Sequence, residues 1–125
     1  VDGIRISFEE LIYPEQESVL IIDNDKLPLL KSEEGAYEIR SIFPYDRHRN
    51  FEVYEIKIEP GEGCEFFLKK EGSSEYIIVV QGVLTLETTE GTYEIAANHA
   101  IKLDASKHHS YHNSGNRQLI LNFFV

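Results

Sequence analysis

Short stretches that alternate between apolar and polar residues recur along this chain. Residues 37–42 and 51–58 alternate with a period of two, and the C-terminal segment places Leu119, Leu121 and Phe123 on one side of a strand. Turn-forming residues separate such stretches about every 8–12 residues, as in sandwiches and barrels. No long segment has the 3.6-residue period of an amphipathic helix. The pattern predicts an all-β sandwich or barrel.

The run richest in Ile and Val, residues 75–86, holds one carboxylate, Glu75, at its start and one glycine, Gly82, in its middle. β-Branched apolar residues favour a buried strand, and a glycine within such a run marks a bulge or bend. Glu75 stands where the strand enters the core. Its carboxylate is therefore either a ligand-binding group or a solvated strand end.

Other segments have weaker patterns. Residues 7–10 have the spacing of a capping box, which predicts either one short N-terminal helical turn or a polar loop. Residues 18–22 predict a strand that ends at the Asp-Asn-Asp turn after them. A hairpin is expected with its tip at Glu90 and Gly91. Further short strands are expected at residues 64–70, 100–104 and 108–113.

The charge of the chain excludes one class of partner. The net charge is −10, and no basic stripe is present. Proteins bind nucleic acid largely by neutralising phosphates with Lys and Arg, so this chain is not expected to bind DNA by itself. It has no apolar run of the ~18 residues that a membrane helix needs, and we expect no membrane partner.

A single cysteine, Cys64, rules out an internal disulfide and fits a reducing compartment, so the expected location is the cytoplasm. Cys64 has no histidine at a recognisable partner spacing, and we interpret it as a small buried hydrophobe. Because the chain begins at Val1 and not at Met, we interpret it as a fragment.

Two ordered motifs carry a family resemblance. Glu75 is followed after six residues by Gly82, and a Pro-Gly-x-Gly turn at residues 60–63 precedes it. Further on, His109 and Asn113 are separated by three residues. In this order the features resemble the two motifs of the cupin superfamily. The resemblance implies a double-stranded β-helix, which is a jelly-roll barrel.

The resemblance is narrower when the upstream segment is included. Residues 37–44, 51–61 and 72–76 resemble the cupin that forms the C-terminal domain of bacterial XRE-type helix-turn-helix transcription regulators. It implies a barrel over residues 35–125. Residues 1–34 would be an extension that packs on the barrel or on a dimer partner. A DNA-binding domain is expected upstream and absent from this chain.

The chain departs from the metal-binding cupins. In those proteins two histidines, a glutamate and a later histidine hold the metal. The first two positions fall here either on Leu68 and Lys70 or on Lys69 and Glu71, and neither pair contains a histidine. Only Glu75 and His109 remain, which could ligate a metal only if one proves to bind. We therefore expect no metal, no cofactor and no enzymatic activity.

A lysine falls on a former ligand position in both alignments, and a protonated ammonium cannot coordinate a metal. Either Lys69 or Lys70 projects inward and its ammonium replaces the metal beside Glu75, or both lysines are solvated. The alternation of apolar residues favours Lys70 as the inward one. With a period of two, His109 and Tyr111 share the inward face, and His108 shares the other face with His112.

Three functions remain open. The favoured one is a domain that senses a small-molecule effector and forms a homodimer within a transcription regulator, with DNA contacted only by the upstream domain. The alternatives are a metal-dependent dioxygenase or isomerase and a ligand-free assembly domain. The expected ligand-binding residues are Phe67, Lys69, Lys70, Glu75, His109, Tyr111 and Phe123.

Overall fold

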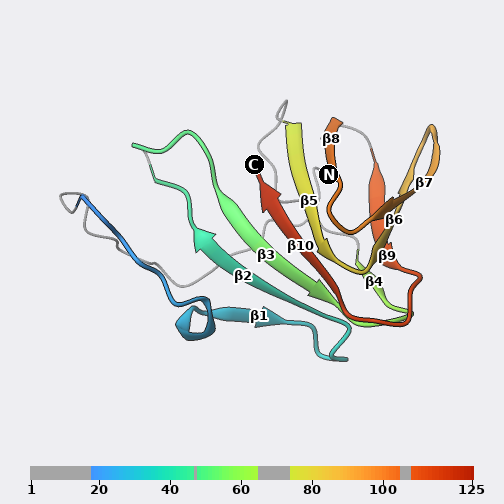
Figure 1. Cartoon of the computed structure of the whole chain (residues 1–125), viewed down its shortest axis with the longest axis horizontal. Coiled ribbons are helices and arrows are strands. Elements are labelled where there is room, and N and C mark those ends of the chain that lie inside the picture. The colour runs from blue at the N-terminus through green and yellow to red at the C-terminus, as the bar shows by residue number, and fades with distance from the viewer. Residues whose placement is uncertain (1–17, 47, 65–73, 105–107) are drawn as a thin grey trace.

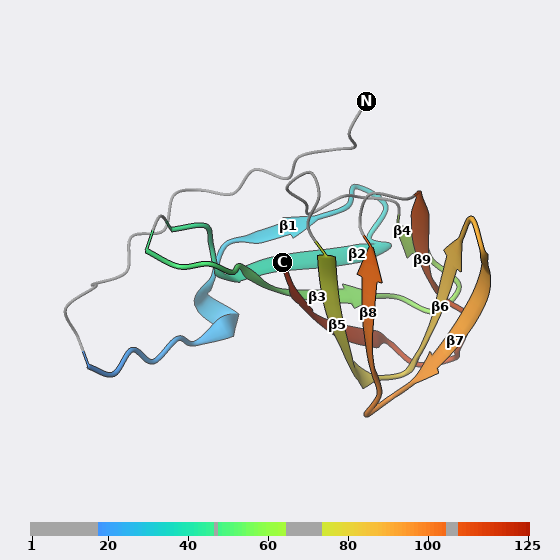
Figure 2. The ribbon, with the colours of Figure 1, turned by 90° about the horizontal axis from the view of Figure 1, so that it is seen from above.

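Two antiparallel sheets face each other across a shared core in a computed structural model that describes residues 18–46, 48–64, 74–104 and 108–125 (Figures 1 and 2). One sheet has six strands in the order β1-β2-β3-β10-β5-β8, and the other has four in the order β4-β9-β6-β7. The strands are β1 (Leu29–Lys31), β2 (Tyr37–Phe43), β3 (Val53–Ile58), β4 (Gly63–Cys64), β5 (Ser74–Gln81), β6 (Val83–Thr88), β7 (Gly91–Ala96), β8 (Ala100–Asp104), β9 (His109–Asn113) and β10 (Leu119–Phe124). The all-β, jelly-roll prediction is confirmed.

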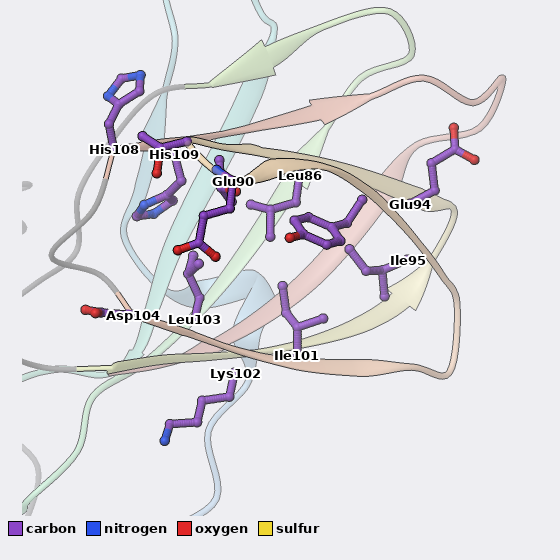
Figure 3. Close-up of a pocket in the computed structure, with 13 residues that line it drawn as sticks. Leu86, Glu90, Glu94, Ile95, Ile101, Lys102, Leu103, Asp104, His108 and His109 are labelled. Carbon is purple, nitrogen blue, oxygen red and sulfur yellow. The ribbon is translucent and has the colours of Figure 1, made fainter.

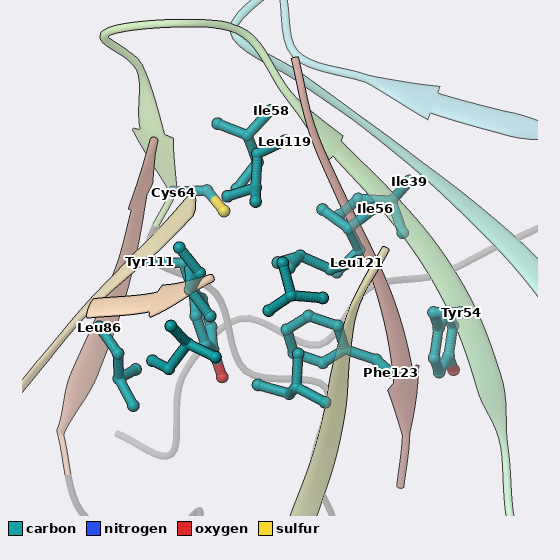
Figure 4. Close-up of a cluster of buried hydrophobic side chains, with 14 residues drawn as sticks. Ile39, Tyr54, Ile56, Ile58, Cys64, Leu86, Tyr111, Leu119, Leu121 and Phe123 are labelled. Atoms are coloured by element: carbon teal, nitrogen blue, oxygen red, sulfur yellow. The ribbon is translucent and has the colours of Figure 1, made fainter. Parts of the chain in front are cut away.

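The core lies between the sheets because each strand turns alternate side chains inward. On β3 the buried residues are Tyr54, Ile56 and Ile58, so this strand keeps one inward face along its length. On β10 Leu119, Leu121 and Phe123 are fully buried, as the sequence predicted. Figure 4 shows how these side chains meet those of the four-stranded sheet, which contributes Cys64, Leu84, Leu86, Ile95 and Tyr111.

Gly82 carries the chain from one sheet to the other. The run of residues 75–86 is two strands, since β5 belongs to the six-stranded sheet and β6 to the four-stranded sheet. Gly82 lies between them with φ +86°, a left-handed conformation that favours glycine. A Cβ atom there would lie 3.2 Å from the Cα of Leu119 and 3.3 Å from the carbonyl oxygen of Gln118.

Replacing Gly82 with alanine is expected to lower the free energy of unfolding by about 2–3 kcal/mol, because backbone strain and a backbone clash add. Gly35 is the matched control: its φ is +73°, but a Cβ there meets nothing within 4 Å. Gly35→Ala should therefore lower stability by only about 1 kcal/mol. Urea denaturation of both variants tests this, and equal losses would show that the packing against Leu119 is unimportant.

The N-terminal part differs from the sequence prediction. Residues 18–22 form no strand, because no neighbouring strand pairs with them, and Val19 and Ile21 are 68% and 88% exposed. A 3-10 turn, η1 (Asn24–Lys26), follows, capped by the side chain of Asp23, which accepts a hydrogen bond from the backbone N–H of Asp25. The helical turn expected at residues 7–10 lies outside the described residues. Within the described part of the chain, no helix has the length and apolarity to cross a membrane.

β1 was not predicted from the sequence. It pairs with β2 and forms the edge of the six-stranded sheet, where Leu29 and Leu30 remain partly exposed.

Charged residues on β2 and β3 form ion pairs with one another. Arg40 lies 3.6 Å from a carboxylate oxygen of Glu55, and Lys57 lies 3.9 Å from the same oxygen.

Candidate functional site

Three polar or aromatic side chains meet inside the apolar core. Glu75, at the start of β5, has the same inward parity as Ile77 and Val79 and is 1% exposed. Opposite it, β9 turns His109 and Tyr111 inward, with 0% and 1% exposure. The prediction that His109 and Tyr111 share the inward face of this strand is therefore confirmed. His108 is exposed and His112 is partly exposed on the other face, also as expected.

Glu75 is held on one side by a hydrogen bond. The hydroxyl of Tyr111 donates to Oε1 of Glu75 over 2.5 Å. The other oxygen, Oε2, has no hydrogen-bonding partner among the described residues and lies 3.6 Å from Nε2 of His109. Buried polar atoms in folded proteins nearly always have a partner, so an open carboxylate oxygen in a core is unusual.

The aromatic rings fix the orientation of these groups. The rings of His109 and Tyr111 are edge-to-face at 5.2 Å, and those of Tyr111 and Phe123 are edge-to-face at the same distance. Such arrangements are favourable for aromatic pairs. Phe123 thus belongs to the core and supports Tyr111 from behind.

Burial raises the pKa of Tyr111 well above 10, and the charge of Glu75 and the hydrogen bond to it raise it further. Tyr111 therefore keeps its proton at neutral pH and remains a donor to Glu75. Burial also raises the pKa of Cys64, which lies in the core with 6% exposure. Since the thiolate is the nucleophile, Cys64 is inert, and its interpretation as a buried hydrophobe is confirmed.

Asn113, the last residue of the second motif, has a structural role that sequence reasoning did not assign. Its Nδ2 donates to the carbonyl oxygens of Ile58 and Arg117, and its Oδ1 accepts from the backbone N–H of Gly115. The amide is fully buried and binds three backbone groups. It therefore joins the end of β3 to the turn between β9 and β10.

A pocket of about 420 Å³ opens next to His109 (Figure 3). It lies between the β6–β7 hairpin, β8 and the start of β9. Leu86, Ile95, Ile101 and Leu103 line it together with Glu90 and His109. This volume is within the usual range for small-molecule sites, about 300–1,000 Å³. Of the residues predicted to bind a ligand, only His109 lines this pocket among the described residues.

The described residues do not fit a metal. No group of three or more His, Cys, Asp and Glu side chains with metal-binding geometry occurs in the described parts of the chain. Glu75 and His109 are close, but one Glu75 oxygen is already bound to Tyr111. Phe67, Lys69 and Lys70, like Leu68 and Glu71, lie outside the described residues, so the inward lysine stays a prediction.

Residues 54–125 match the cupin domain family, and since this is more than half of the chain, the chain belongs to the cupin family. The HTH-type transcriptional regulator SutR of Escherichia coli (strain K12) is 25% identical over 113 residues, which cover 90% of this chain. The chain spans 60% of the length of that relative.

Solved structures share the fold. The cupin domain of an XRE family transcriptional regulator from Enterobacter cloacae has a TM-score of 0.66 at 22% identity, covering 71% of this chain and 94% of that one. Ectoine synthase from P. lautus has a TM-score of 0.67 at 14% identity, covering 85% of this chain and 77% of that one. These identities are low, so the likeness establishes the fold and not the activity.

Proposed function

We propose that this chain is the effector-binding and dimerising cupin domain of a bacterial transcription regulator. The observation that carries the proposal is the relationship to SutR, an HTH-type transcriptional regulator, over 90% of the chain. In this proposal residues 35–125 form the barrel, and residues 1–34 pack on it or on a dimer partner. DNA is contacted by a domain upstream of this chain, which supplies the basic surface that a net charge of −10 lacks here.

The pocket supports the binding of a small molecule. The pocket has apolar walls and a few polar groups, as small-molecule sites commonly have. Behind it, Glu75 and Tyr111 are fixed by a hydrogen bond and aromatic packing. The effector would act by binding one conformation of the regulator more tightly than another, which shifts the population between them.

The dimer is proposed to form on the outer face of β5. Tyr76, Ile78 and Val80 are 50%, 40% and 50% exposed there, and they alternate with the buried Ile77 and Val79. A strand that is apolar on both faces is typical of sheets covered on both sides. We assign the cover to a second copy of the chain. Light scattering should then give twice the mass of one chain, and the mass of one chain would remove this part of the proposal.

A thermal-shift screen tests effector binding. Amino acids, amines, thiols and small organic acids are each added to the chain, and at least one class should raise the melting temperature. At about 100 times its Kd a ligand adds about 2.7 kcal/mol to the free energy of unfolding. Leu103→Trp fills the pocket and should abolish the shift. Tyr45→Trp, at an exposed position that lines neither the pocket nor the proposed dimer face, is the control and should keep it.

Two results would overturn the proposal. If no compound shifts the melting temperature, a ligand-free assembly domain is favoured over an effector-binding domain. If Leu103→Trp keeps the full shift, the ligand binds elsewhere.

A further inference from the structure

The charged residues around the pocket are not equivalent. Figure 3 shows the side chain of Glu90 reaching toward the middle of the pocket, near the ring of His109. The side chains of Glu94, Lys102, Asp104 and His108, which also line the pocket, point away from its middle in the same view. One carboxylate is therefore directed at the space that a ligand would fill.

Hydrogen bonds within the hairpin tip fix the backbone at Glu90. Glu90 is in the two-residue turn between β6 and β7. Its backbone N–H donates to Oγ1 of Thr88 over 3.1 Å, and that hydroxyl donates to the carbonyl oxygen of Gly91 over 3.2 Å. Thr88 is also paired with His109 across the β6–β9 ladder. The tip is thus fixed beside the histidine at the pocket mouth.

A second carboxylate lies deeper. Glu75 is behind His109, with its Oε2 3.6 Å from Nε2 of the imidazole. The order from the mouth inward is Glu90, His109 and Glu75, so the polar groups along this side carry negative charge or can accept hydrogen bonds. The remaining walls are aliphatic: Leu86, Ile95, Ile101 and Leu103. The net charge of −10 adds a field that draws cations toward the protein.

We propose that the effector is a small organic cation, an amine with a short apolar body. Its ammonium group is held by Glu90 and its apolar part lies against Ile101 and Leu103. This inference rests on the proposed function, because it names the ligand class of the same pocket. A carboxylate ligand would meet Glu90 as a like charge and is disfavoured.

Three probes of equal chain length separate charge from apolar burial: hexylamine, hexanol and hexanoate. Binding of each to the 125-residue chain is measured by isothermal titration calorimetry at pH 7.5 and constant ionic strength. The affinity for hexylamine should be at least about tenfold higher than the affinity for hexanoate, and the affinity for hexanol should lie between the two.

Two variants assign the preference to one residue. Glu90→Gln should weaken hexylamine about tenfold and leave hexanol unchanged. Glu94→Gln changes the net charge by the same amount on a pocket residue that points away, and it should leave all three affinities unchanged. An equal loss in both variants would show that only the overall charge attracts the amine, and it would overturn the inference.

The other outcomes separate the inference from the proposed function. If hexanoate binds as tightly as hexylamine, or Glu90→Gln has no effect, the cation preference is wrong while an effector pocket remains. A further outcome is that none of the three probes binds, but the wider screen finds another ligand whose binding is abolished by Leu103→Trp. In that case the inference again fails and the proposed function stands. If that screen also finds nothing, both fail.

Discussion

Replacing Phe123 with alanine is expected to lower the free energy of unfolding by about 3–5 kcal/mol. The ring is fully buried on β10 and packs edge-to-face against Tyr111 at 5.2 Å. Its removal loses buried apolar area and leaves a cavity between the two sheets. Urea denaturation measures the loss. A drop below about 1 kcal/mol would mean that the two sheets are not packed through this ring.

Phe124→Ala is the matched control. Phe124 is the next residue on the same strand, and it turns toward the outer face, where it is partly exposed. The same atoms are removed, but no cavity forms between the sheets. Its loss should be less than half that of Phe123→Ala, and equal losses would contradict the inward face assigned to β10.

The second large effect concerns the buried hydrogen bond. Tyr111→Phe is expected to lower the free energy of unfolding by about 2–3 kcal/mol, because a buried carboxylate loses its donor. Tyr54→Phe removes a comparable bond, from the hydroxyl to Oε1 of Glu52 over 2.8 Å, at a partly buried position. There water can replace the hydroxyl, so the loss should be about 0.5 kcal/mol.

A double variant shows whether the carboxylate causes the loss. Tyr111→Phe combined with Glu75→Leu removes both partners and should recover most of the stability lost in Tyr111→Phe, since apolar residues often replace a buried polar pair without loss. Losses that simply add would show that Glu75 and Tyr111 do not interact.

The strands could be predicted because their side chains alternate. On β3 and β10 every second residue is a large apolar one, and burial of that face decides the register. Gly82 was visible as a bend, but the sequence could not show that the bend moves the chain to another sheet. β1 was missed because its three residues, Leu-Leu-Lys, do not alternate and lie at a sheet edge.

The segment at residues 18–22 shows the opposite error. Its apolar composition favours a strand, yet a strand needs a partner for its backbone groups. In the structure, residues 18–22 pair with none of the described strands. Composition alone could not reveal this.

The candidate site was partly predictable. Glu75 and His109 followed from motif spacing, and strand parity correctly turned Tyr111 to the same side. The pocket was not foreseen, because its walls join the hairpin tip at Glu90 to β8, which are not adjacent in any sheet. A charged residue at a hairpin tip normally indicates a solvated turn, and only the three-dimensional arrangement shows that Glu90 points into the pocket.

The most direct test of the account concerns metal. The compound with the largest thermal shift in the effector screen is measured again on protein from which metal has been removed by a chelator and dialysis. Because the described residues form no metal site, the shift should be unchanged. A shift that disappears after chelation and returns on addition of iron, manganese or zinc would contradict binding by the side chains of this pocket alone.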